Sequence, residues 1–319
     1  MRGTDVMYLA AVGGFVLLFG GGEFLVRGAV AVSRRFGLSP LLIGMTVVAW
    51  CTSAPELVVS MGAALKGSSD IAVGNVVGSN IFNVLGVLGA SAAIAPIVVK
   101  PRALRRDTAV MICAMLALAL IALTGEIGRL AGVGLVLALA AFIIYSYRSE
   151  TCKTCPSAEL HEHEAEEFTG PGSLGAGLGY LAIGLGALVI GAQLLIGGAS
   201  EIARDFGVSE AVIGLSLVAV GTSLPELATS VVAALRGHAD VAVGNVVGSN
   251  IFNVLGILGL TALVRPIGVA AHIASLDVWI MLGVCLALAP LLLIRGRIGR
   301  LAGAVALALY AGYLALLFG

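Results

Sequence analysis

The sequence predicts an all-α, polytopic membrane protein with ten transmembrane helices in two inverted five-helix repeats, in which helices 2 and 7 are broken. An apolar composition, runs of membrane-spanning length and an internal repeat support this prediction. Of the 319 residues, 59% are hydrophobic and 11% are charged, whereas soluble domains contain about 25% charged residues. No soluble core could bury this much apolar surface, and the net charge of zero gives no electrostatic attraction to nucleic acid.

Ten apolar runs follow one another along the chain, each near the length of about 20 residues that crosses a bilayer. Only Arg2 precedes the first run and no clear cleavage site follows it, so we expect a retained span rather than a signal peptide. The expected spans are 7–28, 38–64, 70–95, 105–124, 128–147, 173–198, 208–234, 240–264, 273–294 and 299–318.

The two halves of the chain repeat one another. A shift of 170 residues aligns 21–97 with 191–267 without a gap, and 43 of the 77 aligned positions are identical. Each half holds five spans, an odd number, so we expect the halves to lie upside down relative to each other, as in transporters with broken helices at the midplane. The expected units are a first repeat 1–147, a loop 148–172 and a second repeat 173–319, with their most similar parts at about 38–95 and 208–264.

Lysine and arginine predict the orientation in the membrane. With the N-terminus outside, 13 of the 18 basic residues fall in inner loops, so the positive-inside rule puts both termini outside and the loop 148–172 in the cytoplasm. The expected location is the cytoplasmic (inner) membrane, with the lipid bilayer as partner and no obligate protein partner evident. The loop contains Cys152, Cys155, His161 and His163, but their spacing is short of the usual zinc pattern and we interpret it as a solvated linker.

Two acidic residues stand inside otherwise apolar spans. Glu56 in span two and Glu226 in span seven occupy matching positions of the repeat. An ionised carboxylate at the bilayer centre costs about 2.5–3.5 kcal/mol on insertion scales. No basic residue in the same span is available to pair with either carboxylate. We therefore expect cations from solution to neutralise them.

A proline precedes each of these acids. Pro55 and Pro225 have no N–H for the carbonyl four residues back, and the proline ring pushes that carbonyl aside. We expect a helix break at each proline and loosened carbonyls at Cys51 and Gly221, which is tolerated at this depth where the backbone lines a cavity.

Hard oxygen donors accompany both acids. A threonine and a serine lie four and three residues before each glutamate, on the same helix face. The next span of each repeat adds a serine and an asparagine in an i, i+4 pair. Hydroxyl, amide and carboxylate oxygens suit Ca²⁺, Na⁺ or Mg²⁺ rather than a soft metal. The candidates are Thr52, Ser53, Glu56, Ser79 and Asn83 in the first repeat, and Thr222, Ser223, Glu226, Ser249 and Asn253 in the second.

The motifs TSAPE…GNVVGSNIFN and TSLPE…GNVVGSNIFN resemble the two alpha-repeats of the calcium/cation antiporter superfamily, above all its prokaryotic sodium/calcium exchanger branch. The resemblance covers both repeats and the ten-span layout. It implies a secondary active antiporter without enzymatic activity or cofactor, which exchanges several Na⁺ for one Ca²⁺ by alternating access. The predicted cycle is electrogenic. It also implies that the candidate residues bind the transported ions, together with the backbone carbonyls of Ala49 and Ala219.

Two positions depart from the family pattern. Cys51 replaces the usual glycine before Thr-Ser, and either a narrowed approach to the site or a filled gap between helices would follow. Asn253 stands where some relatives have an aspartate associated with K⁺ use, so we predict a K⁺-independent exchanger. An H⁺/Ca²⁺ or other divalent cation antiporter is the alternative, although its relatives resemble GNxxE where this chain reads GNVVG. A cation channel is the alternative from another class.

Overall fold

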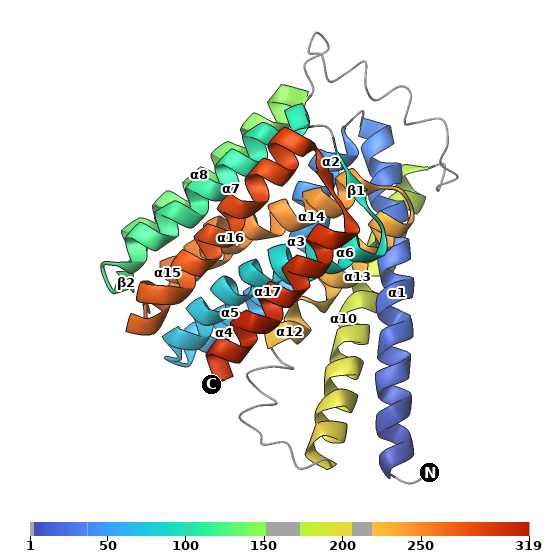
Figure 1. The fold of residues 1–319 in the computed structure, drawn as a ribbon, viewed down its shortest axis with the longest axis horizontal. Helices are drawn as coiled ribbons and strands as arrows, with labels where there is room; N and C mark the ends of the chain where they lie inside the picture. The colour runs from blue at the N-terminus through green and yellow to red at the C-terminus, as the bar shows by residue number, and fades with distance from the viewer. Residues whose placement is uncertain (1–2, 37, 100, 151–172, 206–218, 319) are drawn as a thin grey trace.

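The computed structural model describes residues 3–36, 38–99, 101–150, 173–205 and 219–318, and nearly all of them are helical, which confirms the all-α class (Figure 1). The helices of the first half are α1 (Gly3–Phe36), α2 (Pro40–Ile43), η1 (Gly44–Val48), α3 (Ala49–Thr52), α4 (Ala54–Leu65), α5 (Ser69–Phe82), η2 (Asn83–Val87), α6 (Leu88–Ile94), α7 (Pro101–Ala122) and α8 (Arg129–Glu150). Those of the second half are α10 (Leu174–Asp205), α12 (Ala219–Thr222), α13 (Leu224–Leu235), α14 (Ala239–Ile251), η4 (Phe252–Leu258), α15 (Gly259–Val264), η5 (Ile273–Asp277), α16 (Val278–Pro290), η6 (Leu291–Arg295) and α17 (Arg300–Phe318).

The described helices confirm a polytopic membrane protein. Seven helical stretches are long and apolar enough to cross a membrane, or up to eight if the bent pair Leu41–Thr52 and Ala54–Leu65 forms one span. The count of ten stays a prediction, because α7, at the expected span 105–124, is not among these stretches and the expected span 208–234 begins outside the described residues. The candidate zinc ligands of the loop, among 151–172, also lie outside them, while α8 continues to Glu150.

Two short antiparallel strand pairs join the halves of the chain. Strand β1 (Ile97–Val98) pairs with β4 (Arg297–Ile298), and β2 (Glu126–Ile127) pairs with β3 (Ile267–Gly268). The 170-residue shift exchanges the two pairs, and they lie at opposite ends of α7, which connects β1 to β2. This is the placement expected of two halves that run in opposite directions, although their orientation in a membrane stays a prediction.

The second expected span is broken, but the break lies before the proline. Ser53 separates α3 from α4 with φ −83° and ψ 6°, and the two parts of the span are bent by 46°. Ser223 separates α12 from α13 with φ −92° and ψ 10°. Pro55 and Pro225 are each the second residue of the new helix, a position that needs no intrahelical N–H donor. The helix is therefore interrupted at the serine and restarts one residue before the proline.

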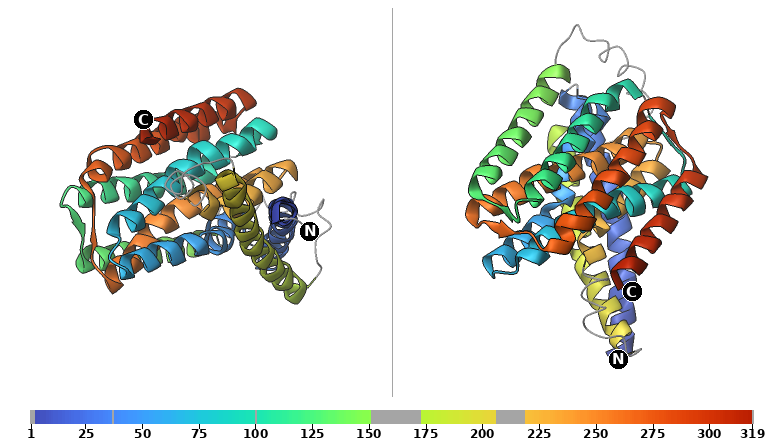
Figure 2. Two further views of the ribbon diagram at one scale, coloured as in Figure 1. Left: turned by 90° about the horizontal axis from the view of Figure 1, so that it is seen from below. Right: turned by 60° about the vertical axis from the view of Figure 1, so that its left-hand side comes forward.

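The long helices α1 and α10 lie side by side and extend beyond the rest of the bundle at the N-terminus of α1 (Figures 1 and 2). Their contact runs along glycines spaced seven residues apart in each helix. A Cβ added to any of them would lie 2.5–2.9 Å from a backbone atom of the partner helix, so the two backbones touch directly. These glycines are Gly14, Gly21, Gly28, Gly184, Gly191 and Gly198.

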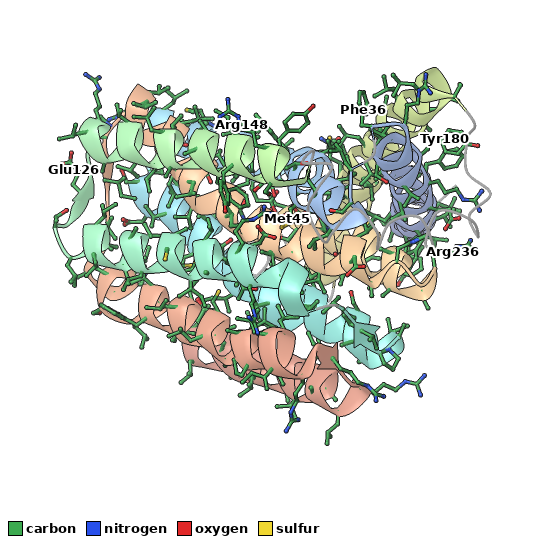
Figure 3. All side chains as sticks on the ribbon, turned by 90° about the horizontal axis from the view of Figure 1, so that it is seen from above. Phe36, Met45, Glu126, Arg148, Tyr180 and Arg236 are labelled. Carbon is green, nitrogen blue, oxygen red and sulfur yellow. The ribbon has the colours of Figure 1, made fainter. Side chains whose placement is uncertain are left out.

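An ion pair ties this helix pair to the rest of the bundle. Glu23 of α1 contacts Arg27 of the same helix, with 2.6 Å between Oε1 and Nε. Its Oε2 lies 2.8 Å from Nε of Arg236, the residue that follows α13. Figure 3 shows Arg236 near α1 and α10, at the opposite end of the molecule from Glu126. The largest buried apolar cluster lies in the rest of the bundle, among α5, α7, α14 and α16.

The glycine contact predicts opposite effects for two substitutions in α10. Gly184→Ala would place Cβ 2.5 Å from the backbone nitrogen of Leu25, and this overpacking should destabilise the protein by about 1–3 kcal/mol. Gly186→Ala meets no atom within 4 Å and should be neutral or stabilise the helix by up to about 1 kcal/mol. The Tm of the two detergent-purified variants measures the difference. Equal Tm values would show that the backbones of α1 and α10 are not in direct contact.

Candidate cation site

Each of the two buried carboxylates is held by a hydroxyl from the other half of the chain. Ser223, at the break between α12 and α13, donates from Oγ to Oε1 of Glu56 over 2.8 Å. Ser53, at the break between α3 and α4, donates from Oγ to Oε1 of Glu226 over 2.9 Å. All four side chains are completely buried. The crossed hydrogen bonds therefore bring both breaks and both acids to one place inside the bundle.

The backbone that follows each break stabilises the ionised form of the glutamate. Glu56 is the third residue of α4 and Glu226 is the third residue of α13. The first turn of a helix has free N–H groups and the positive end of the helix dipole, which stabilise a carboxylate. Among the described residues, Glu23 and Asp107 form ion pairs with basic side chains, whereas Glu56 and Glu226 do not. A cation or a proton must therefore balance most of the charge on the two acids.

Asn75 of α5 fixes the helix that carries the first acid. Its Nδ2 donates to the backbone carbonyl of Glu56 over 3.3 Å and to Oγ of Ser60 over 2.9 Å. The amide thus joins α5 to α4 within the first repeat.

Asn245 of α14 makes the same two contacts in the second repeat. Its Nδ2 donates to the carbonyl of Glu226 over 3.4 Å and to Oγ of Ser230 over 3.0 Å. Its Oδ1 accepts a hydrogen bond from Oγ1 of Thr52 over 3.2 Å, so this asparagine also connects the two halves.

Four completely buried asparagines cross between the halves one turn further along α5 and α14. Asn83 donates from Nδ2 to Oδ1 of Asn250 over 3.1 Å. Asn253 donates from Nδ2 to Oδ1 of Asn80 over 3.0 Å. Asn83 begins the π-helical turn η2 and Asn253 lies in the π-helical turn η4. Such wide turns occur frequently at functional sites.

Several buried oxygens of the candidate residues have no hydrogen-bond partner among the described residues. Leaving such an oxygen unpartnered costs about 1–3 kcal/mol, and more where it is charged. Carboxylate, amide and hydroxyl oxygens are the ligands of hard cations such as Ca²⁺ and Na⁺, so the site has the chemistry of a cation site. The five atoms are Oε2 of Glu56, Oε2 of Glu226, Oδ1 of Asn83, Oδ1 of Asn253 and Oγ of Ser249.

Ser79 and Thr222 lie beside Ser223. Oγ of Ser79 lies 3.1 Å from Oγ of Ser223, within hydrogen-bond distance, and Thr222 is buried beside the second break. The carbonyl of Ala49 accepts from the backbone N–H of Ser53 over 3.0 Å, and Oγ1 of Thr52 lies 3.3 Å from the same oxygen. Because the Thr52 hydroxyl has a single proton, which it donates to Oδ1 of Asn245, the Ala49 carbonyl keeps one lone pair for an ion. Ala219 is the first residue of α12.

Gly221 explains part of the difference between the repeats. A Cβ at this position would lie 2.3 Å from Cδ1 of Ile196 in α10, so a cysteine here requires Ile196 to change rotamer. Cys51, at the matching position, is half-buried in α3. The glycine of the second half therefore serves close packing against α10.

Sequence reasoning missed Asn75, Asn80, Asn245 and Asn250. All four lie in the stretch AVGNVVGSNIFNVLG that is identical at 72–86 and 242–256. An uncharged amide inside an apolar span is itself a signal, because polar groups there need a partner. That signal was available, but it did not say which asparagines would face an ion.

Comparison with known proteins supports one family throughout the chain. The family model described as sodium/calcium exchanger protein matches residues 6–148 and 176–319. The putative antiporter CaxA of Alkalimonas amylolytica is 40% identical over 314 residues, which cover 96% of each chain. The sodium/calcium exchanger MaX1 of Methanosarcina acetivorans is 31% identical over 349 residues, which cover 98% of this chain and 99% of the relative.

Solved structures of the sodium-calcium exchanger NCX_Mj have the same fold. The form soaked with zero Na⁺ and Ca²⁺ has a TM-score of 0.84 and 32% identity, and the match covers 98% of this chain and 99% of that one. The form soaked with 2.5 mM Na⁺ and 0.1 mM Ca²⁺ has a TM-score of 0.82 and 32% identity, with 97% of each chain covered. These matches confirm the resemblance of the TSAPE and TSLPE motifs. The chain belongs to the sodium/calcium exchanger protein family, whose members are membrane transporters and not enzymes.

Proposed function

We propose that the protein exchanges Na⁺ for Ca²⁺ across the cytoplasmic membrane by alternating access. The observations that carry this proposal are the two buried carboxylates brought together by the crossed serines and the five buried, unpartnered oxygens of the candidate residues. The proposed ligands are Thr52, Ser53, Glu56, Ser79, Asn83, Thr222, Ser223, Glu226, Ser249 and Asn253, with the carbonyls of Ala49 and Ala219. Ca²⁺ and Na⁺ are the transported ions in this scheme, not cofactors.

Charge balance favours a divalent cation at this site. Glu56 and Glu226 together carry two negative charges when ionised, and both side chains are completely buried. One Ca²⁺ neutralises both, whereas Na⁺ needs at least two ions for the same effect. Because attraction between charges is strong where water is excluded, either ion set would stabilise a closed site. Competition between the two sets for the same oxygens is the physical basis of exchange.

The crossed arrangement also supports alternating access. Each acid depends on a serine from the other half, so a movement between the halves changes both contacts together. Halves of opposite orientation can form equivalent arrangements that open to opposite sides of the membrane. The proposal includes outside termini, a cytoplasmic loop 148–172, and the repeat units 1–147 and 173–319.

An H⁺/Ca²⁺ antiporter is the second candidate, because two buried carboxylates can also carry protons. The α5 and α14 helices, however, place Asn, and no acid, next to the two glutamates. A continuously open cation channel fits less well, since the acids and their serines are enclosed within the bundle.

The coupling ion can be tested in proteoliposomes under separately imposed gradients. We expect an outward-directed Na⁺ gradient to drive uptake of radioactive Ca²⁺, and an H⁺ or K⁺ gradient of equal size to drive little. The physical reason is that the site holds two acids and uncharged amides, a set that matches several Na⁺ or one Ca²⁺. Uptake driven by H⁺ alone would replace this proposal by the proton-coupled alternative.

Neutralising either acid should abolish exchange. Glu56→Gln and Glu226→Gln each keep the side-chain shape but remove a charge that Ca²⁺ needs at a buried site. The expected result is loss of Na⁺-driven Ca²⁺ uptake in variants that still insert and purify. Glu126→Gln is the matched control, because Glu126 is exposed on the turn at β2 and should leave uptake unchanged. Near-normal uptake by either buried variant would disprove the site assignment.

The exchange should respond to membrane potential. Two Na⁺ would balance the two carboxylates and give an electroneutral cycle, but the hydroxyl, amide and carbonyl oxygens can hold a further Na⁺. The Na⁺-loaded protein then carries one extra positive charge, worth about 2.3 kcal/mol per 100 mV. We expect a valinomycin-set, negative-inside potential to favour Na⁺ entry and Ca²⁺ exit. If the flux does not change with the potential, and a voltage-sensitive dye confirms that the potential was present, the site holds only two Na⁺.

A further inference from the structure

We propose that Asn80 and Asn250 are positioning residues, which determine that Asn253 and Asn83 present an oxygen and not an NH₂ group to the transported ion. The inference rests on the proposed function. It concerns two residues that have no proposed contact with the ion themselves.

A carboxamide has two chemically opposite ends. Its Oδ1 attracts a cation, whereas its Nδ2 carries two N–H donors and repels one. Rotating the side chain of an asparagine by 180° therefore converts a cation ligand into a group that disfavours binding. The hydrogen bonds of the amide decide between the two orientations.

Asn80 and Asn250 make that decision across the halves of the chain. Oδ1 of Asn80 accepts from Nδ2 of Asn253, and Oδ1 of Asn250 accepts from Nδ2 of Asn83. Each contact occupies the nitrogen end of a proposed ligand. The oxygen ends of Asn83 and Asn253 are left buried and unpartnered, together with those of the two glutamates.

Methionine sulfurs hold Asn80 in the required orientation. Its Nδ2 lies 3.7 Å from Sδ of Met115 in α7 and 3.6 Å from Sδ of Met281 in α16. A thioether sulfur accepts hydrogen bonds weakly and donates none. Turning the Asn80 amide would place its oxygen between two acceptors and its nitrogen against another nitrogen. Both contacts are unfavourable, so Asn80 stays fixed.

Asn250 is fixed by the corresponding surroundings. Its Nδ2 lies 3.9 Å from Sδ of Met111 and donates to the backbone carbonyl of Asn80 over 3.4 Å. Met111 and Met281 are separated by 170 residues, so the sulfur contact is part of the internal repeat. The methionine sulfurs therefore fix the amide orientation of one asparagine. That asparagine fixes the amide orientation of a second asparagine in the other half, which faces the ion in this proposal.

A double-substitution experiment separates positioning from a general structural role. Asn80→Ala removes the acceptor for Asn253, and we expect the KM for Ca²⁺ to rise about tenfold with little change in kcat, the size of one lost buried hydrogen bond. Asp at position 253 has two equivalent oxygens and no reversed orientation. In the Asn253→Asp background a carboxylate oxygen faces Oδ1 of Asn80 instead of an N–H group, so Asn80→Ala should leave the KM unchanged or lower it.

Asn83→Asp supplies the matched control background. Asn83 is oriented by Asn250 and not by Asn80, so Asn80→Ala should still raise the KM about tenfold there. Should Asn80→Ala fail to fold, the double variant Met115→Leu and Met281→Leu preserves side-chain volume and removes the sulfur acceptors. It is expected to raise the KM several-fold with Asn at position 253. In the Asn253→Asp background it should leave the KM unchanged or lower it, because the freed Asn80 amide can turn and donate to the carboxylate.

The outcomes distinguish the two levels of the proposal. The ratio to compare is the KM with Asn80→Ala divided by the KM without it. If this ratio is equal in the wild-type, Asn253→Asp and Asn83→Asp backgrounds and the wild-type protein is active, the positioning role is overturned and Na⁺/Ca²⁺ exchange stands. Absence of Na⁺-driven Ca²⁺ uptake by the wild-type protein would overturn both. A tenfold ratio that disappears only in the Asn253→Asp background would establish that Asn80 acts through Asn253.

Discussion

The reciprocal hydrogen bonds between Ser53 and Glu226 and between Ser223 and Glu56 organise the centre of this protein. A buried carboxylate oxygen without a hydrogen-bond partner is costly. Oε1 of each glutamate therefore lacks its serine donor until both halves of the chain have come together. Each serine lies between two helices, at the break of its span. From there its hydroxyl contacts the glutamate of the other half. The breaks, the buried acids and the contact between the halves are therefore one structural solution.

Much of the fold could be predicted because it follows local rules. Apolar length predicts the spans, and a proline-glutamate pair inside an apolar run predicts a broken helix around a charge. The break itself lies at Ser53 and not at Pro55, because proline is well accommodated in the first turn of a helix. The 170-residue shift shows which residues are equivalent. Equivalence, however, does not say which residues touch.

The contacts of the site depend on information that a single sequence does not contain. Ser53 shares a helix face with Glu56 in the linear pattern, yet its hydroxyl bonds to Glu226, 173 residues away. Likewise, Asn80 and Asn83 are identical side chains three residues apart. Only the packing of α7 and α16 against α5 decides that Asn80 faces methionine sulfur. Tertiary placement assigns different chemistry to the same residue type.

The crossed hydrogen bonds also have a consequence for the way the chain is made. Ser223 follows Glu56 by 167 residues, and ribosomes add about 5–20 residues per second. Roughly ten to thirty seconds therefore separate the synthesis of the first acid from that of its partner. During this interval Glu56 has to remain in contact with water or in its protonated form, because an unpaired charge in lipid is expensive. Membrane insertion of the first half is thus provisional until the second half has been translated.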